Sequence, residues 1–152
     1  MERYGEEAHR LLAREYLAPQ LFYCGKIGVL EGDPSYGHLH MVVMEYIDGK
    51  TLDKVKHIPP TLMGQLRHAL DVLHGQGYVF GDLRGPNILI TKNEEVKLIN
   101  FDCAGVHMKS QYPLLISPKL MWPPGVEGLS IMKTEHDDIM LAQLLPVTES
   151  KN

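Results

Sequence analysis

One short stretch, residues 79–90, constrains this chain more than any other feature. Its sequence Val-Phe-Gly-Asp-Leu-Arg-Gly-Pro-Asn-Ile-Leu-Ile lies between an apolar helix pattern and an apolar strand pattern. Gly81 and Pro86 disfavour a continuous helix, so the stretch is predicted to be a loop. Asp82 and Asn87 stand five residues apart in it. A loop anchored at both ends in this way holds polar side chains in fixed positions at the rim of a core.

The polar residues of this loop could serve three different chemical purposes. The carboxylate of Asp82 suits a hydroxyl proton, the guanidinium of Arg84 suits a phosphate, and the amide of Asn87 suits a metal ion. Taken alone, however, Asp82 and Asn87 are more typical of turns and helix caps, and Arg84 could simply brace the loop. The loop therefore needs support from the rest of the sequence.

Hydrophobic periodicity predicts a small strand pair that leads into a mainly helical body. The predicted helices cover residues 4–17 and 135–145, and a third is opened by residues 59–61 and closed by Gly75 and Gly77. The predicted strands cover residues 21–27 and 39–46, joined by a turn at residues 32–37, and a hairpin covers residues 87–99. Residues 51–56 are compatible with one or two turns of helix, and residues 105–130 with a long irregular segment.

Composition excludes several classes of protein. The net charge is -4 and no run of Lys or Arg is present, which argues against a nucleic-acid partner. Two cysteines are too few for a disulfide scaffold, which favours a reducing compartment. No stretch approaches about 18 apolar residues, and no apolar run follows Met1, so neither a membrane span nor a signal peptide is expected. An intracellular location, cytoplasmic or nuclear, follows as an expectation.

Four motifs, taken in order, resemble those of protein kinases. Residues 79–87 resemble the catalytic loop, and residues 97–102, Lys-Leu-Ile-Asn-Phe-Asp, resemble the stretch that carries Asp-Phe-Gly. Residues 44–47 resemble the hinge that meets adenine, and residues 135–138 resemble the start of the helix that braces the catalytic loop. The variants Gly-Asp-Leu-Arg and Phe-Asp-x-Ala-Gly look closest to a fungal kinase-like family. The resemblance extends over nearly the whole chain, from about Tyr4 to Leu145.

The resemblance implies a fold class and a domain organisation. The fold is expected to be α+β and protein-kinase-like, with a mainly α-helical C-lobe and a remnant of the N-lobe β-sheet. Residues 1–152 would form a single, partial kinase-like domain. Residues 1–47 would be the N-lobe remnant and hinge, and residues 48–152 the C-lobe.

The resemblance also implies roles for individual residues in binding ATP and Mg²⁺. Asp82 matches the catalytic Asp, Arg84 the residue that contacts the transferred phosphate, and Asn87 a magnesium ligand. The hinge residues Glu45, Tyr46 and Ile47 would meet the nucleotide, and Glu7, or alternatively Glu6, would pair with the nucleotide-holding Lys. Candidate metal ligands are Asn87, Asn100 and Asp102. Asp137 matches the Asp that braces the loop, although it could instead cap a helix.

Three departures from the kinase pattern bear on activity. No Gly-x-Gly-x-x-Gly loop and no Val-Ala-Ile-Lys-like strand occur in the sequence, which suggests an N-terminally truncated domain. Asn100 stands where the family has a magnesium-binding Asp, and Asp102 could substitute only after a local shift. Phe80 and Gly81 replace the His and Arg of the catalytic loop, and no Ala-Pro-Glu motif follows, which argues against activation by loop phosphorylation.

Three functions therefore remain open. The chain could be a kinase-like domain of phosphotransferase lineage that is degraded or inactive, with protein Ser/Thr as the lineage substrate. It could be an active phosphotransferase on a protein or a small molecule, or a non-catalytic scaffold with a protein partner. Self-association through an exposed edge of the strand pair is also expected.

Overall fold

A computed structural model describes residues 3–27 and 39–144 of the chain. The predicted turn at residues 32–37, and Leu145 at the end of the last predicted helix, lie outside the described residues. The helices are α1 (Glu6–Arg14), α2 (Leu62–Gly75), the short 3-10 helix η1 (Gly85–Asn87) and α3 (Thr134–Gln143). The strands are β1 (Leu21–Lys26), β2 (His40–Met44), β3 (Gly49–Thr51), β4 (Tyr78–Val79), β5 (Ile88–Thr91), β6 (Val96–Leu98) and β7 (Gly105–Val106).

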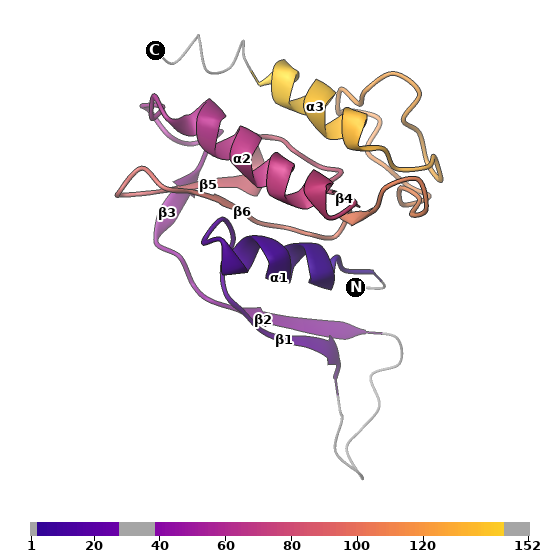
Figure 1. Cartoon of the computed structure of the whole chain (residues 1–152), viewed down its shortest axis with the longest axis horizontal. Helices are drawn as coiled ribbons and strands as arrows, with labels where there is room; N and C mark the ends of the chain where they lie inside the picture. The colour runs from indigo at the N-terminus through magenta and orange to yellow at the C-terminus, as the bar shows by residue number, and fades with distance from the viewer. Residues whose placement is uncertain (1–2, 28–38, 145–152) are drawn as a thin grey trace.

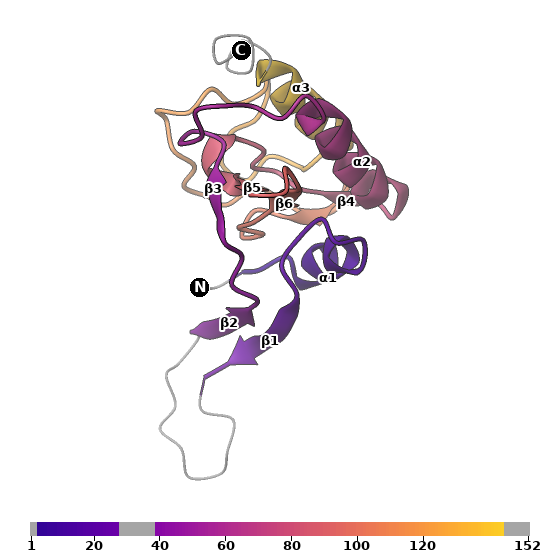
Figure 2. The ribbon, with the colours of Figure 1, turned by 90° about the vertical axis from the view of Figure 1, so that its left-hand side faces the viewer.

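These elements form a small strand pair and a larger body, with α1 between them (Figure 1). The strands make three antiparallel sheets, in the orders β1-β2, β3-β5-β6 and β4-β7. Helix α2 packs over the three-stranded sheet, and α3 packs against α2 (Figure 2). No helix within the described ranges is long and apolar enough to cross a membrane. The α+β class is confirmed, whereas the division at residues 47 and 48 stays a prediction.

Helix α2 supplies the centre of the core. Its predicted apolar stripe is fully buried, which confirms the periodicity; the stripe consists of Leu62, Leu66, Ala69, Leu70 and Leu73. The helix ends at Gly75, and Gly77 follows with a φ of 79°. A left-handed residue after the last turn favours glycine, so the predicted end of the helix is also confirmed.

The predicted hairpin that follows the polar loop is present as β5 and β6. Ile88 pairs with Leu98 and Ile90 with Val96, and all four side chains are buried. Because β5 continues directly from η1, this hairpin fixes the C-terminal end of the loop to the core.

The prediction for residues 51–56 was wrong. No helix forms there; instead β3 pairs with β5, and turns follow it. A Cβ atom on Gly49 would lie 2.6 Å from the Ile90 carbonyl oxygen, so glycine permits this close pairing rather than breaking the chain. The body is also less helical than predicted, because among the described residues from 48 onward only α2 and α3 are α-helices. Residues 105–130 are largely irregular, as predicted.

A buried aromatic stack joins α1 to the body. The ring of Phe101 makes an edge contact with the ring of Phe80 and stacks on the ring of His9. The ring centroids lie 5.3 Å apart in the first pair and 4.5 Å apart in the second. The Nε2 of His9 lies 2.7 Å from the Pro19 carbonyl oxygen, and its Nδ1 lies 2.6 Å from the Tyr4 hydroxyl. This pairing fits a neutral ring that donates to Pro19 and accepts from Tyr4. Burial, assisted by the positive charge of Arg10, lowers the pKa of His9.

The lowered pKa of His9 predicts a loss of stability in mild acid. Below pH about 6.5 the unfolded chain protonates its histidines while folded His9 stays neutral. The unfolded state then binds more protons, so the free energy of unfolding should fall as the pH drops from about 6.5. Urea unfolding at several pH values measures this slope, and His9→Gln should reduce it. The exposed His57 provides the control, because His57→Gln should leave the slope unchanged. Equal slopes for His9→Gln and the unmodified chain would contradict the prediction.

Candidate functional site

The buried carboxylate of Asp137, on α3, fixes the start of the polar loop (residues 79–87) by hydrogen bonds. It accepts hydrogen bonds from the backbone N–H groups of Phe80 and Gly81, each at 2.8 Å. The His74 Nε2 donates to the same carboxylate at 2.9 Å. The expected bracing role of Asp137 is therefore confirmed, and it does not act as the N-cap of α3, which is Lys133.

Gly81 is required by the backbone of this loop. Its φ is 83°, and a Cβ atom there would lie 2.6 Å from Met132 Cε and 3.0 Å from the Cys103 carbonyl oxygen. Any side chain would be strained by the left-handed conformation and would also collide with these neighbours. The packing around position 81 therefore leaves no room for the arginine that the kinase pattern has there.

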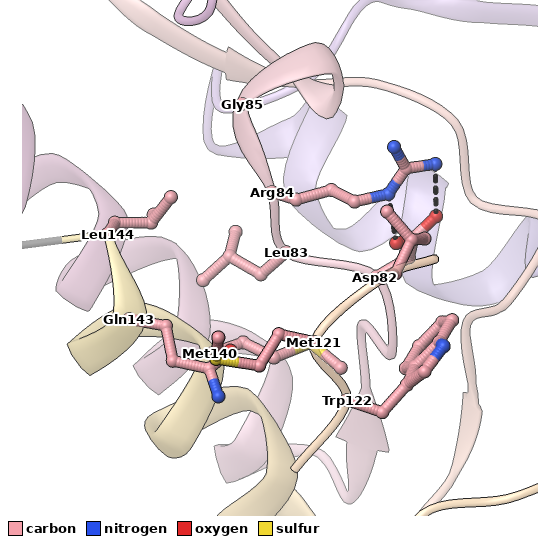
Figure 3. A pocket seen from close by; sticks show the side chains of 10 residues that line it. Asp82, Leu83, Arg84, Gly85, Met121, Trp122, Met140, Gln143 and Leu144 are labelled. Atoms are coloured by element: carbon pink, nitrogen blue, oxygen red, sulfur yellow. Dashed lines mark hydrogen bonds and ion pairs between the residues drawn. The ribbon is translucent and has the colours of Figure 1, made fainter. Parts of the chain in front are cut away.

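Asp82 and Arg84 form an ion pair at the loop surface. The guanidinium Nε donates to Asp82 Oδ1 at 2.6 Å, and Nη2 donates to Oδ2 at 3.4 Å (Figure 3). Only 7% of Asp82 is exposed. Both carboxylate oxygens of Asp82 are therefore engaged, and its charge is balanced locally.

The three candidate metal ligands lie close together, but two of the three are neutral amides and only Asp102 has a carboxylate. Asn87 donates to the Asp82 carbonyl oxygen at 2.9 Å, and its own Oδ1 accepts from Asn100 Nδ2 at 3.3 Å. Asn100 has a φ of 66°, and its Oδ1 accepts from the Asp102 backbone N–H at 3.4 Å. Burial, together with the negative charge of Asp82, raises the pKa of Asp102.

This arrangement does not fit a magnesium ion. Mg²⁺ prefers carboxylate oxygens in an octahedral set, and the two amides here are already bonded to each other. Among residues 3–27 and 39–144, no group of three or more His, Cys, Asp or Glu side chains is placed to hold a metal. The role of Asn87, Asn100 and Asp102 as metal ligands stays a prediction.

A cavity of about 490 Å³ is lined both by the predicted hinge and by Asn100. Glu45, Tyr46 and Ile47 line it together with Asn100 and Asp102, and Leu89 lies in the same lining. Glu45 is fixed, since its carboxylate accepts from the Gln20 backbone N–H at 3.0 Å. Five residues predicted from separate motifs thus surround one cavity, which is large enough for a small molecule.

Glu7, the predicted partner of a nucleotide-holding Lys, lies outside the hinge cavity. Glu7 is exposed and lines a different cavity beside Tyr78 and Val106. Glu6 forms an ion pair with Arg10 at 3.0 Å. Neither glutamate lines the hinge cavity, and a cofactor role for Glu7 stays a prediction.

A second cavity, of about 290 Å³, opens beside Asp82 and Arg84 (Figure 3). Sequence reasoning missed its walls, which come from α3 and from the irregular segment after β7. Met121, Met140 and Gln143 belong to them. No periodicity or motif marks these residues, because the fold alone brings the two segments together. Cys103 is half-buried, and burial raises the pKa of its thiol to about 11.

Comparison with known families supports the kinase resemblance. A family model described as lipopolysaccharide core biosynthesis protein (WaaY) matches residues 17–112, more than half of the chain. The chain belongs to the WaaY family. The matched span includes the hinge and the polar loop, and it ends at Tyr112. The WaaY match and the relatives below support a kinase-like domain, whereas the resemblance to a fungal family and the N-terminal truncation stay predictions.

Curated relatives of this WaaY-family chain are serine/threonine-protein kinases. PknB of Mycolicibacterium smegmatis is 34% identical over 82 residues, covering 49% of this chain and 13% of the relative. YabT of Bacillus subtilis is 47% identical over 53 residues, covering 32% and 16%. The probable kinase mkcF of Dictyostelium discoideum is 30% identical over 102 residues, covering 61% and 15%. The chain thus spans between 13% and 16% of the length of these relatives.

The Asp137 brace predicts a sharp contrast between neighbouring aspartates. Asp137→Asn replaces one acceptor oxygen with an N–H₂ group that faces a buried donor, so the free energy of unfolding should fall by about 3 kcal/mol. Asp138→Asn breaks a half-exposed pair with Arg67 and should cost less than about 1 kcal/mol. Urea unfolding of both variants measures the difference. Similar losses for the two variants would show that the loop does not depend on Asp137.

Proposed function

We propose that this chain carries the nucleotide cavity and the acceptor loop of a phosphotransferase of kinase lineage, with weakened phosphoryl transfer. The observation that carries the proposal is the neutral amide of Asn100, which lines the hinge cavity and donates to Asn87 at 3.3 Å. The lineage expectation is ATP with Mg²⁺, in which carboxylates hold the metal ion and the metal ion balances the charge of the phosphates. Asn100 supplies an oxygen without a charge.

The chemistry assigned to the loop is transfer of the γ-phosphoryl group to a hydroxyl. The acceptor oxygen forms a bond to phosphorus, the bond from phosphorus to the ADP oxygen breaks, and the hydroxyl proton passes to Asp82. Arg84 would contact the transferred phosphoryl group. To do so, its guanidinium must first break the ion pair with the Asp82 carboxylate. The ion pair between them supports a resting state in which the base is shielded.

Two acceptor classes are consistent with the relatives. The family description names lipopolysaccharide core biosynthesis, which favours a hydroxyl on a lipopolysaccharide core. The relatives named serine/threonine-protein kinases favour a protein hydroxyl. Because the chain spans a small part of those relatives, an assay of both classes is needed to choose between them.

Restoring a carboxylate at position 100 tests this proposal. The unmodified chain should bind ATP with little dependence on Mg²⁺, and Asn100→Asp should make binding tighter with Mg²⁺ than without it. One charge pair at about 4 Å and an effective dielectric of about 20 contributes about 4 kcal/mol before desolvation. Half of that corresponds to roughly 30-fold in phosphoryl-transfer rate. Calorimetry with and without Mg²⁺ measures binding, and release of ADP measures transfer.

Asp71→Asn is the matched control, because Asp71 is an exposed aspartate on α2 that pairs with Arg67 and does not line the hinge cavity. It should not change the response to Mg²⁺. Micromolar, Mg²⁺-dependent binding by the unmodified chain would overturn the weakened-site proposal. No binding at millimolar ATP would favour the alternative, a scaffold that ignores nucleotide.

Self-association is proposed for the β1–β2 pair. This sheet has two strands in the described part of the chain, so each strand has an edge outside the ladder, and Phe22, Met41 and Val43 are exposed on it. Unpaired edges with apolar side chains favour pairing with another chain. Light scattering should show a mass that rises with concentration, and Met41→Lys with Val43→Lys should return it toward that of a monomer. A constant monomer mass at high concentration would contradict this.

A further inference from the structure

The cavity beside the Asp82–Arg84 pair has the composition of a binding pocket for an uncharged molecule. At about 290 Å³ it lies near the lower end of the roughly 300–1,000 Å³ typical of small-molecule sites. Its walls come from three separate segments, the polar loop, α3 and residues 120–122 (Figure 3). The cavity shares no lining residue with the one beside the hinge.

The walls of this pocket are mainly apolar. Leu83, Met140 and Leu144 are buried parts of its lining, whereas Met121 is 80% exposed. Trp122 forms a further wall and is held in place, since its Nε1 donates to the Ser117 carbonyl oxygen at 2.8 Å. Methionine side chains adapt to the shape of an apolar ligand, whereas a fixed indole offers a rigid flat face.

The polar groups are confined to the edges of the pocket. Asp82 and Arg84 lie at one end and neutralise each other at 2.6 Å, and Gln143 contributes an uncharged amide. A charged ligand would lose its hydration against the apolar walls without finding an unpaired opposite charge. An apolar group that carries a hydroxyl loses little hydration there and can place that hydroxyl near Asp82.

We infer that this pocket receives the apolar portion of an uncharged, hydroxyl-bearing amphiphile, with the hydroxyl directed toward Asp82. The inference rests on the proposed function for the role of Asp82 and narrows its acceptor class. A small polar sugar without an apolar portion would leave the methionine and tryptophan walls uncovered. Contact with those walls makes the apolar portion, rather than the hydroxyl, the main source of affinity.

Trp122 provides a direct readout, because it is the single tryptophan of the chain. The probe is n-octyl β-glucoside below its micelle concentration, titrated against the full chain while indole emission is followed. We expect a saturable change in emission with octyl glucoside and none with glucose at the same concentrations. Saturating ATP should leave the dissociation constant within about twofold, since the two cavities have separate linings.

Met121→Asp tests the pocket without disturbing the core, because the side chain is largely exposed. It should weaken octyl glucoside binding by about fivefold or more. Leu115→Asp is the matched control, since Leu115 lies in the same irregular segment, is 90% exposed and does not line the pocket. It should leave binding unchanged, and circular dichroism should show that both variants keep the fold.

Three results with octyl glucoside and its controls would overturn the inference, in addition to the ATP result given next: no saturable change in emission, an equal response to glucose, or equal affinities for Met121→Asp and Leu115→Asp. Displacement of octyl glucoside by ATP would also overturn it. The proposed function fails on a different result, absence of ATP binding in calorimetry. Octyl glucoside binding without ATP binding would therefore support the pocket while removing the phosphotransferase proposal.

Discussion

The site depends on the buried carboxylate of Asp137. Its two oxygens accept the backbone N–H groups of Phe80 and Gly81, which would otherwise be buried without partners because the loop cannot form regular secondary structure there. An unpaired buried donor costs about 1–3 kcal/mol, so these bonds stabilise the one loop conformation that satisfies both groups. His74 orients the carboxylate from α2, which links the loop to the apolar stripe of that helix. The loop is thus positioned by the core rather than by its own sequence.

A fixed loop explains why single substitutions can change the chemistry without changing the fold. Asn100 is nearly the same size as aspartate, so the position keeps its packing, but its Nδ2 donates to Asn87 Oδ1 where an ionised aspartate could only accept. Gly81 is tolerated because Met132 occupies the adjoining space. In both places the packing is kept and the electrostatics differ from the kinase pattern. The size of these residues therefore determines the packing, whereas their charge determines the electrostatics of the site.

The parts of the fold that sequence predicted are those with strong local signals. The α2 stripe, the β5–β6 hairpin and Asp137 follow from periodicity or from a motif with fixed spacing. Strand β3 was missed because Gly49 reads locally as a break, and its role depends on a close approach to Ile90 that only the tertiary structure creates. The walls formed by Met121 and Met140 were missed for the same reason. Neither position carries a pattern until α3 and the irregular segment meet.

The Asp82–Arg84 pair connects these observations to function. Each group satisfies the other, so the resting loop presents little net charge to the cavity that it lines. A phosphate that draws Arg84 away would leave the Asp82 carboxylate free to accept a proton, whereas an uncharged acceptor alone has no charge with which to separate the pair. Separation of the pair costs little if the phosphate replaces the carboxylate as the partner of the guanidinium. Because the two cavities have separate linings, nucleotide and acceptor would bind in either order under the proposed function, and only the phosphate at Arg84 would free the base.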